Sequence, residues 1–224
     1  MAEIIKLRSA SAYRVYARGD VGTLYLYGII GDSFFADGIT AKQVAEDLKK
    51  LGRLATLNVR INSEGGDVFQ GKTIYSLLKA NPARIVAHVD GLAASSASLV
   101  AMAAHEIKIA DGSFMMIHNA WSRVIGNAAD LREVVALLEQ VDQTIVDTYA
   151  GRTRQTREQI AAWMAAETWF GAADAKQHGF ADQIVENMKV AAMITDAAQF
   201  RNLPAGLRPR RDRVQSYLAS IKGS

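Results

Sequence analysis

ARIVAHVDGLAASSAS, residues 83–98, joins an apolar run to a cluster of small residues that contains three serines. The first half, 83–90, is short and rich in apolar residues and predicts a buried strand. The second half predicts a helix that starts near the serines and runs to Ala104. Backbone N–H groups in the first turn of a helix lack intrahelical acceptors, and the helix dipole adds positive character there. Ser95 therefore has ready-made oxyanion donors beside it, although tight packing of small residues explains the same pattern.

Strand-like and helix-like patterns alternate on both sides of this stretch. The expected strands cover 21–30, 55–62 and 83–90, with two short ones in 105–120, and the expected helices cover 41–51, 68–81, 128–150 and 156–166. Thr40 is the expected N-cap of the first helix. Strands that alternate with helices pair in parallel, with the helices as crossovers. The sequence thus predicts an α/β fold.

The apolar residues of the long helix at 128–150 form a narrow seam. They recur three and four positions apart, at Leu131, Val134, Leu138, Val141, Ile145 and Tyr149. Such a seam covers either the sheet of the same subunit or the surface of a partner. A second apolar set, at Val135, Leu137 and Val146, makes the helix apolar on more than one side, which favours a partner subunit.

A base that activates a serine must be one of four histidines. His88 lies inside an apolar strand, His105 begins a strand, and His178 lies near a helix end, where it can cap carbonyl groups. His118 follows the apolar run SFMMI and so lies at the carboxyl end of a strand. Functional sites of open α/β sheets gather at such strand ends. We therefore expect His118 to be the base, with a purely structural histidine as the alternative.

The carboxylate that orients this base is less clearly marked. Five candidates are Asp111, Asp130, Glu167, Asp174 and Asp182. Glu167 lies between apolar neighbours in AAETWF, where a carboxylate would be buried and would need a partner. Gly65 and Gly66 end the strand at 55–62 and allow a backbone N–H to approach a substrate without interference from a Cβ. Glu167 is the leading acid, and the glycine pair is the leading second oxyanion donor.

The composition narrows the class of protein. The 224 residues include no cysteine, which excludes a disulfide framework and a thiolate metal site. No apolar run approaches the ~20 residues of a membrane-spanning helix, and the first residues lack the apolar core of a secretory signal. The net charge of +3 comes largely from arginines near the carboxyl end, with no interleaved aromatic residues for base stacking. We expect a cytoplasmic protein that binds neither nucleic acid nor a membrane.

Four motifs in order carry a resemblance to a known family. The motifs are INSEGGDV (61–68), GLAASSAS (91–98), MMIHN (115–119) and ETWFGAADAKQHGFAD (167–182). They resemble the Clp-type serine peptidases, and among these they are most similar to the versions encoded by phages and prophages. The resemblance covers about residues 20 to 187. It implies a ClpP/crotonase-type spiral of ββα units with a protruding handle helix at about 126–150. The peptidase domain would then cover 1–190, and an Arg/Pro-containing appendage would cover 191–224.

The resemblance also implies roles for individual residues. Ser95 matches the nucleophile, His118 the general base, and Glu167 stands where the family usually has aspartate. The backbone N–H groups of Gly66 and Ser96 match the oxyanion hole. Glu64 replaces the family's proline, and a short strand near Gly126 would pair with an extended substrate. No metal and no cofactor is implied.

The function implied by the resemblance is that of a serine endopeptidase that cuts polypeptides. The phage-like wording points to the processing of capsid or scaffold proteins, in the host cytoplasm or the prohead, by a homo-oligomeric ring. A general turnover subunit that works with an ATP-dependent unfoldase is an alternative, although no segment clearly matches the family's axial-pore region. Further alternatives are a crotonase-type acyl-thioester enzyme, a signal-peptide peptidase relative with a Ser/Lys pair, and an inactive assembly scaffold.

Overall fold

The coordinates are a computed structural model that describes residues 4–9, 13–31, 38–186, 194 and 197–207. The strands in this part of the chain are β1 (Ile4–Ser9), β2 (Tyr13–Arg18), β3 (Val21–Ile30), β4 (Thr56–Gly66), β5 (Arg84–Ala94), β6 (Glu106–Ala110), β7 (Phe114–Ile117), β8 (Thr168–Gly171) and β9 (Gln183–Val185). The helices are α1 (Ala41–Leu51), α2 (Val68–Ala80), α3 (Ser96–Ala101), α4 (Ala128–Thr153), α5 (Arg157–Ala165) and α6 (Ala172–Gln177), with short 3₁₀ turns at Ala197–Gln199 and Ala205–Leu207.

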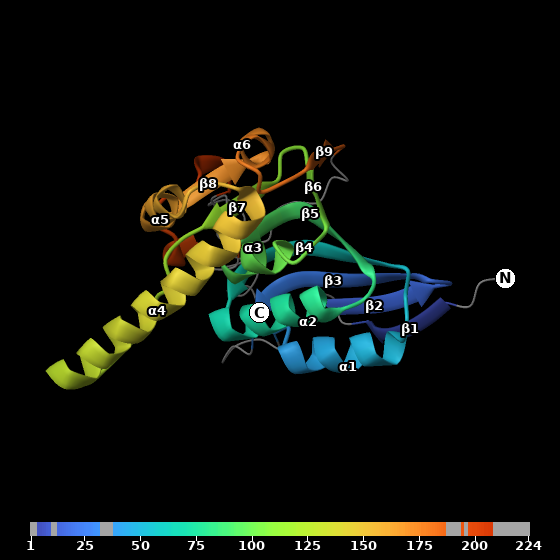
Figure 1. Ribbon diagram of the computed structural model, residues 1–224, viewed down its shortest axis with the longest axis horizontal. Coiled ribbons are helices and arrows are strands. Elements are labelled where there is room, and N and C mark those ends of the chain that lie inside the picture. Colours follow the sequence, from blue (N-terminus) through green and yellow to red (C-terminus); the bar gives the residue numbers. More distant parts are fainter. Residues whose placement is uncertain (1–3, 10–12, 32–37, 187–193, 195–196, 208–224) are drawn as a thin grey trace, which may run out of the picture.

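The strands form one mixed sheet whose main path has the order β1-β2-β3-β4-β5-β6-β9 (Figure 1). Off this path, β7 pairs with β5 and with β8. From β3 to β6 the neighbours are parallel, and α1, α2 and α3 are the crossovers between them. α1 and α2 lie side by side on one face of the sheet (Figure 1). The predicted α/β class is confirmed, since strands and helices alternate as the hydrophobic pattern requires.

Side chains at the helix starts explain why these segments begin where they do. The Thr40 hydroxyl accepts from the N–H of Gln43, and the Gln43 side chain accepts in turn from the N–H of Thr40. Asp67 accepts from two N–H groups in the first turn of α2. Asn127 and Asp130 form a reciprocal pair at the start of α4. Each cap satisfies N–H groups that a helix leaves without partners.

β5 changes partner along its length, and this fork positions the site. Val86–Val89 pair with β6, whereas Leu92–Ala94 pair in parallel with β7. The sequence pattern ended this strand at residue 90, but the strand continues through Ala94 because its small residues form ladder hydrogen bonds with β7. α3 is correspondingly shorter than the predicted helix. As a result, the carboxyl ends of two parallel neighbours, β5 and β7, lie next to each other.

α4 projects away from the sheet and is packed only at its carboxyl-terminal half (Figure 1). Ile145, Val146 and Tyr149 are buried, whereas Leu131 and Val135 are exposed. The predicted seam therefore covers this subunit's own core at one end and remains open at the other. None of the helices in the described residues combines the length and the apolar character that a membrane span needs.

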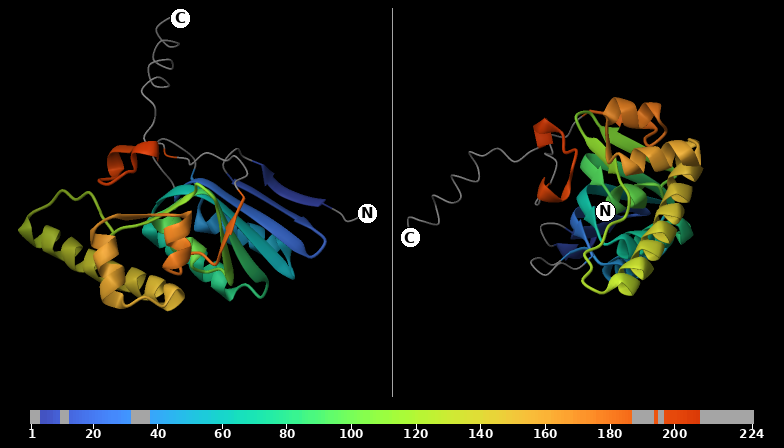
Figure 2. Two further views of the ribbon diagram at one scale, coloured as in Figure 1. Left: turned by 90° about the horizontal axis from the view of Figure 1, so that it is seen from above. Right: turned by 90° about the vertical axis from the view of Figure 1, so that its left-hand side faces the viewer.

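Residues 197–207 pack against the rest of the chain (Figure 2). Phe200 and Leu203 are buried in a small apolar cluster with Leu92, Ala94 and Met116. This segment belongs to the predicted appendage at 191–224, and the boundary at residue 190 stays a prediction. The remaining tail residues, with Arg208, Pro209, Arg210, Arg211 and Arg213, lie outside the described residues.

Candidate active site

Ser95 and His118 follow the two strands that end side by side. The N–H of Ser95 donates to the carbonyl oxygen of Met116 at 2.9 Å, which joins the end of β5 to the end of β7. The Oγ of Ser95 then lies 2.8 Å from the Nε2 of His118. Ser95 has φ 52° and ψ −127°, a left-handed conformation that is costly for a residue with a side chain. Strained residues of this kind cluster at functional sites.

The other two serines of the cluster have different surroundings. The Ser98 hydroxyl is fully buried and lies within 3.0 Å of the carbonyl oxygens of Ser95 and Met116. It also lies 2.8 Å from the hydroxyl of Tyr149, whose pKa is raised by burial, so that this phenol stays protonated. The Ser96 hydroxyl is buried without a hydrogen-bond partner in the described part of the chain. Ser98 thus connects the predicted nucleophile Ser95 to Tyr149, near the carboxyl-terminal end of α4. The apolar seam alone did not predict this connection.

The glycine motif lies directly against Ser95. Ser63 pairs with Ala93 across β4 and β5, so the glycines that follow Ser63 face the residues that follow Ala93. A Cβ on Gly65 would lie 2.7 Å from the Cβ of Ser95, and a Cβ on Gly66 would collide with the carbonyl oxygen of Ile30. Gly65 and Gly66 also have φ 93° and 138°, which favour glycine. The close approach of β4 to the end of β5 therefore requires glycine at residue 65, and its close approach to β3 requires glycine at residue 66.

The two residues whose backbone N–H groups are the predicted oxyanion donors lie in the groove beside Ser95. Ser96 is the first residue of α3, so its N–H lacks an intrahelical acceptor. Gly66 and Ser96 line the same groove as Ser95 and His118. The groove has a volume of about 490 Å³, and apolar side chains of α4, including Leu138 and Val141, form another of its walls. The arrangement can hold an extended chain with a carbonyl group near Ser95.

Glu167 is buried but makes no hydrogen bond to His118 in the described part of the chain. Its carboxylate accepts from the backbone N–H groups of Arg201 at 2.9 Å and Asn202 at 2.7 Å, and from the indole N–H of Trp169 at 3.3 Å. Glu167 has φ 49°, a second strained residue at the site. The sequence indicated that this carboxylate would need partners, but it did not indicate that they would come from residues 201 and 202.

The charge of Glu167 nevertheless acts on His118. Burial is the largest influence and lowers the pKa of the imidazole, the carboxylate of Glu167 raises it, and the guanidinium of Arg201 lowers it. The net pKa lies below the usual value of a histidine. The ring is therefore neutral at neutral pH, as a general base must be.

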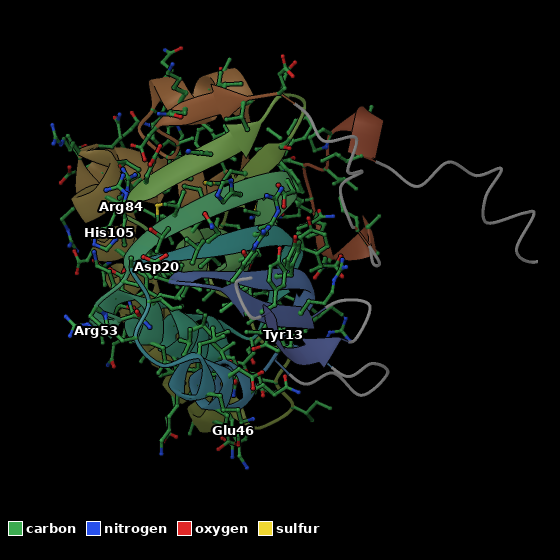
Figure 3. The ribbon with its side chains drawn as sticks, turned by 90° about the vertical axis from the view of Figure 1, so that its right-hand side faces the viewer. Tyr13, Asp20, Glu46, Arg53, Arg84 and His105 are labelled. Carbon is green, nitrogen blue, oxygen red and sulfur yellow. The ribbon has the colours of Figure 1, made fainter. Side chains whose placement is uncertain are left out.

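The other histidines have structural contacts remote from Ser95. His105 accepts from the N–H of Ile85 at the opposite end of β5, and Figure 3 shows it near Arg84. His88 contacts Asn58 at 3.1 Å within the sheet. His178 is the C-cap of α6, and its ring packs at a tilt against Trp163, with 4.8 Å between the ring centroids.

The alternative acids are also placed elsewhere. Asp182 binds Arg152 and the N–H of Ile107, and Asp130 belongs to the cap of α4. Asp111 and Asp174 are exposed. Near Gly126 the resemblance implied a short strand, but residues 118–127 contain none.

Comparison with known proteins identifies the family. A family model described as Clp protease matches residues 21–188, most of the chain. The chain belongs to the Clp protease family. It is thus a serine peptidase, a hydrolase, as the resemblance implied.

Individual relatives agree with this assignment. The chain is 32% identical over 162 residues to the ATP-dependent Clp protease proteolytic subunit 1 of Chlamydia abortus, covering 68% of this chain and 84% of that protein. It is 31% identical over 135 residues to the subunit 1 of Corynebacterium jeikeium, covering 59% and 72%. A solved structure of a ClpP1 mutant from Listeria monocytogenes superposes with a TM-score of 0.63 at 23% identity, covering 72% of this chain and 90% of that one. The last likeness confirms the predicted ClpP/crotonase-type fold.

The electrostatics of this Clp-type site predict its pH dependence. Because the pKa of His118 is lowered, the rate of Ser95 modification by a tagged fluorophosphonate should fall only below about pH 6.5, the ordinary histidine value. Glu167→Gln should move the midpoint to lower pH, since it removes a charge that raises this pKa. Arg201→Gln should move it to higher pH. A wild-type midpoint above 6.5, or shifts of the opposite sign, would contradict this account.

Proposed function

We propose that the chain hydrolyses peptide bonds with Ser95 as the nucleophile and His118 as the general base. The observation that carries the proposal is the 2.8 Å contact between Oγ and Nε2 at the open end of two parallel strands, beside a groove. An acyl-thioester enzyme of crotonase type has no need of such a pair. The pair also argues against an inactive scaffold.

The chemistry follows from these positions. Nε2 of His118 takes the proton from Oγ of Ser95 as Oγ attacks the peptide carbonyl carbon. The N–H groups of Gly66 and Ser96 stabilise the negative charge that develops on the carbonyl oxygen. The imidazolium then gives its proton to the leaving amine, and a water molecule hydrolyses the acyl-enzyme by the same route. Glu167 stabilises the imidazolium through its charge.

Covalent labelling tests the nucleophile. A tagged fluorophosphonate should modify Ser95 alone, as located by peptide mass spectrometry, because Ser95 is the serine that contacts His118. Ser95→Ala should abolish labelling and lower peptide turnover by about a million-fold. Ser76→Ala, which changes an exposed serine on α2, should leave both unchanged. An adduct on Ser98, or none on the wild-type protein, would refute the mechanism.

We also propose that the chain assembles into a ring of identical subunits through α4. The exposed part of this helix carries Leu131, Val135 and Leu137, each more than 40% accessible in the single chain. Apolar side chains gathered on a projecting helix mark a surface for a partner. The relatives are named as proteolytic subunits, which supports an assembly.

Light scattering tests the ring. The wild-type mass should be a multiple of 24.3 kDa. Val135→Glu should shift the distribution toward smaller species because it places a charge in the apolar surface. Glu133→Gln, an exposed polar change on the same helix, is the control. A wild-type protein that stays monomeric at micromolar concentration would reject the proposal.

For substrates, we propose capsid or scaffold precursors of a phage or prophage. Support comes from the segments NSEGGDVFQG and ETWF, whose sequences resemble those of phage-encoded members of the Clp protease family. General turnover with an ATP-dependent unfoldase is the alternative that the relatives' names favour.

Two assays separate these roles. A precursor encoded beside this chain should be cut at defined sites without ATP by the wild type and not by Ser95→Ala. Degradation of a folded protein only when a Clp ATPase and ATP are added would instead assign the chain to general turnover.

A further inference from the structure

Residues 199–203, here called the C-terminal brace, lie at the candidate active site although they are far from it in sequence. Gln199 and Phe200 line the groove that contains Ser95 and His118. Figure 2 shows the segment, in red, against the folded part of the chain. The brace follows the last sheet strand and the family match, which ends at residue 188.

The brace supplies most of the hydrogen bonds of Glu167. The N–H groups of Arg201 and Asn202 donate to different oxygens of the carboxylate, at 2.9 Å and 2.7 Å. Without them, the indole of Trp169 at 3.3 Å would be the remaining hydrogen-bond donor in the described part of the chain, beside an ion pair with the exposed Arg201 guanidinium at 3.9 Å. A buried carboxylate with so few donors is strongly disfavoured, so it would turn toward solvent. The brace therefore fixes where the charge of Glu167 lies.

The same brace contacts two other parts of the site. The Gln199 amide donates to Glu64 in the glycine motif at 3.2 Å. The Asn202 side chain donates to the carbonyl oxygen of Ala166, at the end of α5, at 2.6 Å. It thus joins the strand end that carries the oxyanion glycines to the turn that carries the acid.

Apolar side chains dock the brace on the sheet. Phe200 and Leu203 are 7% and 5% exposed, and the Phe200 ring packs edge-on against Trp169 with 5.2 Å between the ring centroids. Both belong to the apolar cluster that contains Met116, two residues before His118. The backbone N–H groups that bind Glu167 lie between these two anchors, so the anchors set their position.

We propose that the C-terminal brace is a positioning element of the active site, in which the N–H groups of Arg201 and Asn202 hold the carboxylate of Glu167 where its charge acts on His118. The proposal rests on the roles proposed above for Ser95 and His118. An inhibitory strap would interrupt the nucleophile and base. Here the contact between Ser95 and His118 is intact at 2.8 Å, and the hydrogen bonds of the brace go to the acid and the glycine motif.

A pair of substitutions at residue 202 isolates the backbone donor. Asn202→Ala and Asn202→Pro both remove the side-chain amide, but only proline also removes the N–H that binds Glu167. The measurement is the maximal rate of Ser95 modification by a tagged fluorophosphonate, separated from the affinity for the probe and followed against pH. Adduct formation on wild-type Ser95 tests the proposed function independently of the brace.

We expect Asn202→Pro to lower the maximal rate about 10- to 100-fold relative to Asn202→Ala, the scale of a misplacement of ~1 Å. The midpoint of the acid limb should also move to lower pH. The charged groups that act on His118 are Glu167, which raises its pKa, and Arg201, which lowers it, and Glu167 has the larger effect. Both Asn202 substitutions are also made in an Arg201→Gln background. There the Arg201 charge is gone, so a shift of the pH midpoint reports the displacement of the Glu167 charge.

A second pair covers the case in which Asn202→Pro does not fold. Leu203→Ala removes an anchor that is buried beside the N–H groups that bind Glu167 and that does not line the groove. Leu207→Ala removes an apolar contact of the same cluster four residues further on and is the control. Leu203→Ala should lower the maximal rate and the pH midpoint while the affinity for the probe is retained.

Three results would overturn the proposal. Equal rates for Asn202→Pro and Asn202→Ala, together with equal rates for Leu203→Ala and Leu207→Ala, would show that the C-terminal brace has no effect on the site. A lower rate with an unchanged midpoint would show a role in folding alone. A higher rate would show that the brace restrains the enzyme.

Discussion

The hydrogen bond from the N–H of Ser95 to the carbonyl oxygen of Met116 is the contact on which the candidate site depends. It closes the short parallel ladder between β5 and β7 and leaves both chains to emerge at the same place. The hydroxyl belongs to the donor residue Ser95 itself, and His118 follows the acceptor residue Met116 by two positions. If β5 paired with β6 along its whole length, β7 would be displaced and the two side chains could not meet.

Burial and hydrogen bonding hold the strained geometry that this contact creates. Ser95 and Glu167 both have positive φ, at a cost on the order of 1–3 kcal/mol each. Ser98 offsets part of it, because its single hydroxyl hydrogen is shared between the carbonyl oxygens on both strand ends and its oxygen accepts from the Tyr149 hydroxyl of α4. A buried hydrogen bond contributes roughly 1 kcal/mol. The carboxyl-terminal part of α4 therefore helps to support the site. A movement of α4 on assembly would displace Ser95 through the side chain of Ser98.

The α/β fold and the position of His118 at a strand end could be predicted from the sequence, because both depend on local patterns in the chain. Strand and helix periodicity depends on neighbours in the chain, and the position of His118 after an apolar run already placed it at a strand end. The length of β5 was missed because GLAA is equally suited to a helix, and only its pairing with β7 decides. The environment of Glu167 was missed because its donors are backbone groups 34 and 35 residues away. Phe200 and Leu203, three apart among polar neighbours, were the available signal of a docked segment, but the adjacent prolines and arginines favoured an appendage outside the compact domain.

The brace gives a common physical reason for two departures from the family pattern. Glu64 stands in place of proline, which has no side-chain acceptor, and it accepts from Gln199. Glu167 stands in place of aspartate, whose shorter side chain would hold its carboxylate about one bond length further from the N–H groups of the brace. The first replacement therefore creates an acceptor, and the second extends one, that a segment beyond the family match can bind. A carboxylate that is satisfied by the chain's own carboxyl-terminal segment needs no hydrogen bond to His118 to stay buried, and it can act on the imidazole by charge alone.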